Sequence, residues 1–319
     1  MLIFEQDLKT ILNKYLFLIK LISVGLMISY LGYKIYSDAS WKFFSNYKDY
    51  HIKYISLAVL LTIVNWGLEA KKWQLLLNNI KQLSFFNCYK SVLAGLSLGI
   101  MTPNRVGNFI GRLAWVEKDQ QHQATINTLL GNLAQFTSTL IFGSIGLFVV
   151  LLYQFSFKYA WLILLTSIFV IIFSIIVYFN PLLVKRTMFI RFLSDKTINS
   201  LSSIAKTSIQ FKLKIIGLSV LRYVVFLIQY FLLFKAFNVD VDIIIMFGLI
   251  STVYLLTTLI PSIFFGKLFI RESVAVFVFS FVDIDTPLIL LIAFILWVIN
   301  LAIPALLGGL IWLNKSNNK

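Results

Sequence analysis

The chain of 319 residues has little of the chemistry that catalytic and metal sites use. Its one cysteine, Cys88, excludes an intramolecular disulfide and a cysteine metal cluster. The two histidines, His51 and His122, lie far apart near the ends of apolar stretches, so we expect no shared metal site. No Walker A loop, HExxH or GxSxG occurs, and no apolar span or hairpin contains a pair of carboxylates. We therefore predict a protein that is not an enzyme, needs no cofactor and drives no ATP-dependent transport alone.

Acidic residues are also scarce. The sequence has 13 Asp and Glu against 28 Lys and Arg, which gives a formal net charge of +15. The basic residues cluster between apolar stretches, and no nucleic-acid-binding motif accompanies them. Anionic lipid headgroups are therefore the expected partner of this charge, and nucleic acid is not.

Apolar sequence is abundant, and several apolar runs exceed the length needed to cross a bilayer. The hydrophobic fraction is 59% and the mean hydropathy is +0.88, whereas soluble domains have roughly 45–50% apolar residues. This composition predicts an all-α polytopic membrane protein. The expected spans are residues 15–36, 52–70, 124–154, 159–179, 215–237 and 286–313, the last kinked at Pro304.

One apolar stretch, residues 85–116, is broken in its middle. Pro103 lacks a backbone donor and disfavours helix in the residue before it. Gly107 and Gly111 permit close backbone approach. Arg105 and Arg112 stand beside them, although an arginine at membrane depth costs about 2.5–3.5 kcal/mol on insertion scales. This pattern predicts a broken helical hairpin inside the membrane, with buried and functional arginines.

A second interrupted stretch, residues 243–282, repeats this pattern half a chain later. Its Pro261, Gly266 and Arg271 follow Pro103, Gly107 and Arg112 by 158, 159 and 159 residues. Half the chain is about as long as this offset. We therefore infer an internal duplication, with repeat one in residues 1–155 and repeat two in residues 156–319 of a single transmembrane domain.

Charge distribution predicts how the two repeats are oriented. The basic stretch 182–214 and the C-terminal tail are expected inside, and the acidic turns near 240–242 and 283–285 outside. The resulting topology has about six full spans and two hairpins that enter from opposite faces, which is the inverted-repeat design of many transporters. Both termini are then cytoplasmic. Hairpin arms of about 18 residues leave open whether they cross fully or only re-enter.

The hairpin arginines are candidates for binding a phosphate-bearing lipid headgroup. Arg105 and Arg112 are seven residues apart, which on a helix places them on one face, and Arg271 is at the matching position of the second hairpin. A guanidinium binds phosphate through two hydrogen bonds and stays charged when desolvated. Helix starts at the breaks would add N–H donors. The predicted headgroup site contains Arg105, Arg112, Arg271, Thr102, Gly107 and Gly266.

A structural role for the same arginines is the alternative. They would then pair with Glu69 and Glu272, or cap carbonyls at the broken helices. Arg222 lies deep enough in its span to need a partner as well. Glu272 can also titrate and couple protons, although a salt bridge is the commoner role of such a residue. We expect the side chain of Lys267 to extend outward to the interface. We expect Asn127, Asn132 and Gln135 to form interhelical hydrogen bonds or to line a polar path.

Residues 102–112 resemble a signature of the lysylphosphatidylglycerol synthase transmembrane family, Thr-Pro-x-Arg-x-Gly-(Glu)-x-x-x-Arg. Pro261 and residues 266–272 resemble the family's Pro-x-x-Gly-Gly-x-Gly-x-Arg-Glu, and residues 221–223 match its Leu-Arg-Tyr. Two positions depart from the pattern. Asn108 stands where the family usually has Glu, and residues 263–265 are bulkier than the small residues expected there. The family's soluble aminoacyl-transfer domain is absent from this sequence, so a stand-alone member is expected.

This resemblance implies a flippase-like protein of the cell (inner) membrane that moves a lipid between leaflets. The implied cargo is an anionic or aminoacylated phospholipid or a polyprenyl-phosphate lipid. Two alternatives remain from other classes. One is a non-transporting partner of a separately encoded lipid synthase or glycosyltransferase. The other is an intramembrane enzyme acting on a lipid phosphate, for which Glu69 and Glu272 are the available carboxylates.

Overall fold

The computed structural model describes residues 18, 21–22, 24–37, 50–102, 105–153, 158–181, 183, 195–261 and 266–317, and the described regular structure is entirely helical. Residues 24–37 form a helix. The helices that follow are α3 (Ile52–Leu77), α4 (Phe85–Met101), α5 (Val106–Leu113), α6 (Gln121–Tyr153), α7 (Ala160–Phe179), α8 (Asp195–Ala205), α9 (Ile209–Ala236), α10 (Ile243–Leu259), α11 (Gly266–Phe279), α12 (Thr286–Trp297), η4 (Val298–Ala302) and α13 (Ile303–Asn317).

Five of these helices are long and apolar enough to cross a membrane: α3, α6, α7, α9 and the continuous run 286–315. They match five of the predicted spans closely. The apolar surface they present is extensive; on α7, for example, Trp161, Leu165, Phe169 and Phe173 are exposed. A helix that is apolar on its exposed side belongs in lipid. The protein is therefore a multi-pass membrane protein, as its composition predicts.

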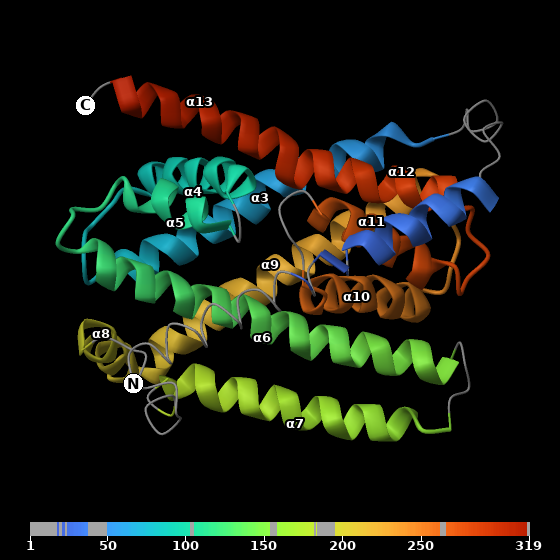
Figure 1. Cartoon of the computed structure of the whole chain (residues 1–319), viewed down its shortest axis with the longest axis horizontal. Helices are drawn as coiled ribbons and strands as arrows, with labels where there is room; N and C mark the ends of the chain where they lie inside the picture. The colour runs from blue at the N-terminus through green and yellow to red at the C-terminus, as the bar shows by residue number, and fades with distance from the viewer. Residues whose placement is uncertain are drawn as a thin grey trace.

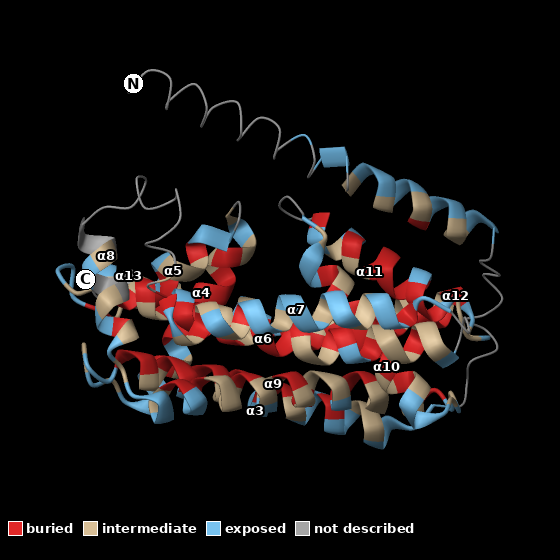
Figure 2. Cartoon of the chain, turned by 90° about the horizontal axis from the view of Figure 1, so that it is seen from below, coloured by how far each residue is buried: buried red, intermediate tan, exposed pale blue. Residues whose placement is uncertain are grey.

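Two helical hairpins occupy opposite ends of the molecule. Helices α4 and α5 form the first and α10 and α11 the second, and within each hairpin the two helices pack together. In Figure 1 the first hairpin lies at the end that holds the C-terminus, and the second lies at the other end. Both views place the end of α4 and the start of α11 near the middle of the long axis (Figures 1 and 2). The hairpins thus point toward each other.

Helix boundaries repeat at the offset seen in the sequence. The last residues of α3 and α9 are separated by 236 − 77 = 159 residues, and the first residues of α4 and α10 by 243 − 85 = 158. The ends of α4 and α10 also differ by 259 − 101 = 158. Each half therefore has the same order of span, hairpin and long span.

Contacts between the halves are reciprocal. Helix α3 packs on its counterpart α9, α6 packs on α10, and α13 packs on α4. Small residues make the last two contacts close: Gly146 of α6 lies against Ser251, and Gly308 of α13 lies against the carbonyl of Leu93. In both of these contacts the long span of one half packs on the first hairpin helix of the other half, as a two-fold relation between the repeats would produce. The repeat boundaries at residue 155 stay a prediction.

The arms of the first hairpin are unequal in length. Helix α4 has 17 residues and α5 has 8, which at 1.5 Å per residue correspond to about 25 Å and about 12 Å. A bilayer core is about 30 Å thick, so α5 is too short to cross it. The returning arm of the first hairpin is therefore re-entrant, which answers the question the sequence left open for this arm. In the second hairpin α10 has 17 residues and α11 has 14.

The regular α-helix of the last span is interrupted just before Pro304, where the sequence predicts a kink. A single π-turn, η4, separates α12 from α13 immediately before this proline. Proline cannot donate to the carbonyl four residues earlier and its ring crowds that carbonyl. The carbonyl of Asn300 is thereby freed, and it accepts a hydrogen bond from Trp66 Nε1 of α3 at 3.2 Å. The π-turn therefore joins the last span to α3.

Part of the predicted basic segment 182–214 is helical. Helix α8 and the first turns of α9 lie within it, whereas Lys185, Arg186 and Arg191 lie outside the described residues. Lys212 has a structural role: its Nζ donates to the carbonyls of Phe179 at 2.8 Å and Ala205 at 3.2 Å, at the ends of α7 and α8. Pro103 and the first part of span 15–36 also lie outside the described residues.

The buried apolar residues form two clusters, one around each hairpin. The first includes Cys88, Val92 and Leu96 of α4, and the second includes Val274, Ala275 and Phe279 of α11. Figure 2 shows buried residues concentrated along α4, α9, α10 and α11, with exposed residues on the outer faces. Each hairpin is thus packed as part of the protein interior, except at its tip.

Candidate functional site at the hairpin tips

A buried carboxylate on α3 is bonded to three cations. Glu69 Oε1 lies 2.8 Å from Arg112 Nη2 of α5, and Oε2 lies 2.8 Å from both Arg222 Nη1 of α9 and Lys72 Nζ of α3. Glu69 and Lys72 are each 2% exposed and Arg112 is 5% exposed. This four-residue cluster, hereafter the Glu69 node, joins the first hairpin to spans of both halves.

Neutral polar side chains hold the Glu69 node in place. Asn65 Oδ1 accepts from Arg222 Nε at 2.7 Å, and Asn65 Nδ2 donates to Asn300 Oδ1 at 3.1 Å. Asn108 Oδ1 accepts from Arg112 Nε at 2.9 Å. The arginines also lie over rings: Arg112 over Trp73 at 5.7 Å and Arg222 over Trp66 at 4.9 Å. Buried ion pairs are stable only when their remaining polar atoms are bonded in this way.

Glycines bring the two arms of the first hairpin into contact. A Cβ on Gly111 would lie 2.5 Å from Cα of Gly95, and one on Gly107 would overlap the carbonyl of Leu98. Thr102 Oγ1 accepts from the N–H of Gly107 at 2.7 Å and donates to the carbonyl of Leu98 at 2.9 Å. The expected close approach is confirmed. In this structure Thr102 and Gly107 bond to each other, so this N–H is not a free donor at the start of α5.

Arg271 of the second hairpin has different partners. Its Nη2 lies 2.6 Å from the carbonyl of Ala293 on α12. The same atom lies 3.1 Å from Oε1 of Glu272, its neighbour on α11. The other atoms of this pair, Arg271 Nε and Glu272 Oε2, are buried without a hydrogen-bond partner. Arg112 thus pairs with Glu69, and Arg271 with Glu272, as expected if these arginines have a structural role. A role of the two arginines in binding a ligand stays a prediction.

Arg105 does not share a helix face with Arg112, and that expectation is wrong. Arg105 precedes α5 in a left-handed conformation with φ 57° and ψ 30°, which helical spacing does not describe. Its side chain is exposed, and this side chain has no hydrogen-bond or ion-pair partner among the described residues. A non-glycine residue with positive φ is uncommon, costs roughly 1 kcal/mol or more and is enriched at functional sites. Arg105 thus precedes α5 outside the helix and is not bonded to Glu69 as Arg112 is.

Lys267, near the start of α11, is a second free cation. It is exposed, and its side chain has no hydrogen-bond or ion-pair partner in the described part of the chain. Arg105 and Lys267 are close enough to repel each other, and Arg105 also feels the charge of Arg222. The tips of the two hairpins therefore bring unpaired positive charge together. Sequence reasoning assigned Lys267 only an interfacial role and missed this arrangement.

Exposed apolar side chains flank both free cations. Met101, Val106 and Ile110 are exposed beside Arg105, and Leu259 and Phe269 are exposed near Lys267. Gly266 lies against Val24 of the helix 24–37, so this helix covers the start of α11. A charged group beside apolar surface suits an amphipathic ligand better than a fully hydrated one.

The polar residues of α6 act between helices. Asn127 donates to the carbonyl of Leu76 at 2.7 Å, and Gln135 donates to the carbonyl of Ser219 at 3.3 Å. Asn132 is exposed. The sequence reasoning also missed the stripe of Asn65, Glu69 and Lys72 on α3. Their spacing of four and three residues places them on one helix face, a signal that was present in the sequence.

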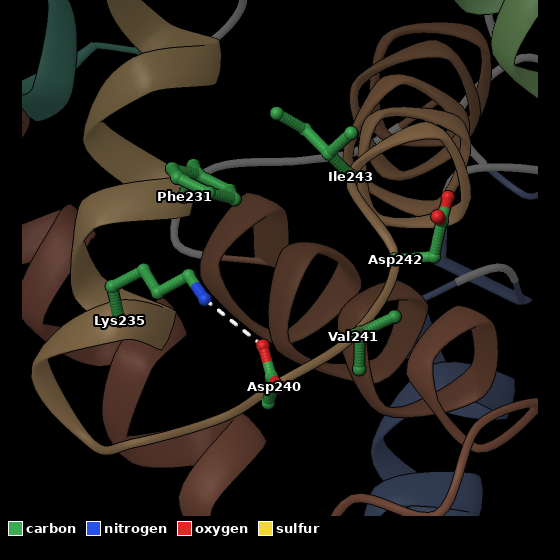
Figure 3. Close-up of a pocket in the computed structure, with 6 residues that line it drawn as sticks. All are labelled: Phe231, Lys235, Asp240, Val241, Asp242 and Ile243. Atoms are coloured by element: carbon green, nitrogen blue, oxygen red, sulfur yellow. Dashed lines mark hydrogen bonds and ion pairs between the residues drawn. The ribbon is translucent and has the colours of Figure 1, made fainter.

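A surface pocket at the turn between α9 and α10 lies apart from these residues. It is lined by Phe231, Lys235, Asp240, Val241, Asp242 and Ile243, and Lys235 Nζ bonds Asp240 Oδ1 at 3.1 Å (Figure 3). Asp242 is occupied as the N-cap of α10, where it accepts from the N–H groups of Ile244 and Ile245. No group of His, Cys, Asp or Glu able to hold a metal occurs among the described residues.

The fold defines a class of protein: a polytopic helical membrane protein with two related halves and opposed hairpins. Residues 19–308 match the family model of the lysylphosphatidylglycerol synthase TM region. The chain belongs to this family, which is connected with membrane lipid metabolism. No curated protein and no solved structure matches the chain.

Proposed function

We propose that this protein moves a phosphate-containing lipid between the two leaflets of the cell membrane. The observation that carries the proposal is the pair of unpaired cations, Arg105 and Lys267, at the tips of hairpins that approach from opposite ends. Lipid phosphate would bind there while its acyl chains remain beside Met101, Val106 and Leu259. Unpaired charge at membrane depth is retained mainly where function needs it.

Opposed hairpins support movement across the membrane and not binding alone. In transporters built from inverted repeats, the site lies at the repeat interface near the bilayer midplane, where broken helices meet. The reciprocal contacts of α3 with α9, α6 with α10 and α13 with α4 provide such an interface. Under this proposal both termini are cytoplasmic, in accordance with the charge bias of the loops.

The carboxylates that an enzymatic reaction would need are already bonded to cations. Glu69 binds three cations, and Glu272 binds Arg271. A general base needs to reach the proton that it abstracts, and neither residue is free at the tips. This arrangement favours transport over intramembrane catalysis. A separately encoded synthase is compatible with the proposal, as an enzyme that supplies or uses the lipid.

The test is leaflet exchange of labelled phospholipids in proteoliposomes containing the purified protein. We expect exchange above that of empty vesicles, and at least a tenfold loss in Arg105→Ala, since about 1.4 kcal/mol of lost binding has this effect. Lys235→Ala removes an exposed cation at the end of the molecule and serves as the matched control. Folded protein that exchanges no phosphate lipid would overturn the proposal.

A further inference from the structure

The charge of the site indicates which phosphate it takes. We propose that the preferred headgroup is a phosphomonoester, which carries up to two negative charges, and not a phosphodiester or an aminoacylated headgroup. This inference rests on the proposed function, because it concerns the same site, and it names the chemical class of the lipid.

Basic side chains outnumber acidic ones among the charges that act on one another at the site, either in ion pairs or through space. Lys72, Arg112 and Arg222 are bonded to Glu69, Arg105 lies within electrostatic range of Arg222, and Lys267 within range of Arg105. These are five basic side chains and one carboxylate. With each in its usual ionised form, the excess is four positive charges.

No other acid in the described spans and hairpins offsets this excess. Apart from Glu69, the helices α3 to α7 and α9 to α13 contain one further acidic residue, Glu272. Arg271 neutralises it through the 3.1 Å ion pair. The remaining described acids lie in turns or at helix ends away from the tips, as with Asp240 and Asp242. The positive excess is therefore left for a ligand to balance.

A phosphomonoester balances more of this charge than a diester does. At neutral pH a monoester carries about −1.5 to −2, whereas a diester carries a single negative charge. In surroundings less polar than water, each added opposite charge is worth more than it is in solvent. A third free oxygen also gives guanidinium groups another acceptor. A lysyl ester would instead bring two ammonium groups toward Arg105 and Lys267.

The apolar surface beside the cations indicates that the phosphate belongs to a lipid. Val106 and Ile110 are exposed next to Arg105, as are Leu259 and Phe269 near Lys267. Inorganic phosphate would gain nothing from these side chains, whereas an acyl or polyprenyl chain would bury them. The two sources of phosphomonoester chemistry can be separated experimentally.

The experiment compares two lipids that differ by one methyl group. Phosphatidic acid and phosphatidylmethanol, with the same labelled acyl chains, are placed in phosphatidylcholine vesicles containing the full chain at pH 7.5. We expect phosphatidic acid to exchange at least about fivefold faster, after subtraction of the rate in empty vesicles. The ratio should fall toward one in Lys267→Gln and stay unchanged in Lys235→Gln. Lysylphosphatidylglycerol should be the slowest of the lipids tested.

The other outcomes separate the two proposals. Equal exchange of the two lipids, or faster exchange of lysylphosphatidylglycerol, would overturn the monoester inference and leave the translocase proposal standing. Exchange of no lipid by folded protein would overturn both. Uptake of radiolabelled inorganic phosphate into the vesicles, without lipid exchange, would overturn both as well and show that free phosphate is the ligand.

Discussion

The two hairpins carry the same Gly-x-x-x-x-Arg pattern but use the arginine differently. Arg112 of the first hairpin reaches Glu69 on another helix, and through it Arg222 of the other half. Arg271 of the second hairpin bonds its own neighbour Glu272 and the carbonyl of Ala293. Ile228 occupies the position 159 residues after Glu69, so the second half has no equivalent carboxylate. A shared motif therefore fixes where an arginine lies and not what it binds.

This difference assigns separate roles to the cations. In the first hairpin, Arg112 connects α5 to both repeats through Glu69. In the second hairpin, Arg271 connects α11 to α12. The cations whose side chains are unpaired among the described residues, Arg105 and Lys267, belong one to each hairpin tip. We accordingly expect the paired residues to govern stability and the unpaired ones to govern transport.

The largest effect is expected from Glu69→Gln. This change leaves Lys72, Arg112 and Arg222 close together without a counter-charge, and removing one partner of a buried ion pair costs about 3–5 kcal/mol. We predict a large fall in the unfolding temperature of the detergent-purified protein, or loss of folded protein. Glu117→Gln is the control, since Glu117 pairs with Lys81 at the surface and its side chain is 63% exposed. Equal stability of the two variants would contradict the role of the Glu69 node.

An intermediate effect is expected from Gly111→Ala. The new Cβ would lie 2.5 Å from backbone atoms of Gly95, which cannot move without separating α4 from α5, and overpacking costs about 1–3 kcal/mol. Gly266→Ala should be milder, because the atom it meets is a methyl group of Val24. A Cβ added at Gly217 would have nothing within 4 Å, so Gly217→Ala is the control that gains helix propensity without a clash. A larger fall in unfolding temperature for Gly266→Ala than for Gly111→Ala would contradict the claim that the first hairpin is packed more tightly at its glycine.

A smaller effect is expected from Glu272→Gln. In this variant Arg271 keeps its bond to the carbonyl of Ala293, and its side chain is 21% exposed to the surroundings. The charge of Arg271 therefore loses its carboxylate partner but not all of its stabilisation. We predict a loss of about 1–2 kcal/mol in unfolding free energy. Denaturant unfolding of Glu272→Gln and Glu69→Gln, measured side by side, compares how much each carboxylate contributes to the unfolding free energy. A Glu272→Gln loss as large as that of Glu69→Gln would show that the two hairpin arginines have equivalent roles.

The sequence predicted the architecture better than the site. The starts of α4 and α10, the interruption of the helix before Pro304 and the 159-residue offset follow from local signals such as apolar length, proline and repeated glycine. Pairing of Arg112 with an acidic residue was one of two alternatives, the other being binding of a lipid headgroup, because spacing along a chain does not show whether a cation meets a carboxylate of the protein or a ligand. The roles of Asn65 and Asn300 depend on the packing of α3 against η4, 235 residues apart.

Arg105 shows why the remaining error arose. Helical periodicity placed it beside Arg112, but the broken segment ends in a left-handed residue at this position. Left-handed backbone is usually signalled by glycine or asparagine, and Arg105 gives no such signal. The conformation that exposes the cation is therefore a property of the folded hairpin.

The most direct test of the role of the hairpin tips is to measure lipid exchange and unfolding temperature together in Arg105→Gln/Lys267→Gln. Neither side chain has a partner among the described residues, so the unfolding free energy should change by no more than about 0.5 kcal/mol. We predict that exchange of phosphatidic acid falls to the rate of empty vesicles in this stable variant. Exchange at the wild-type rate would contradict the claim that the hairpin tips hold the lipid phosphate.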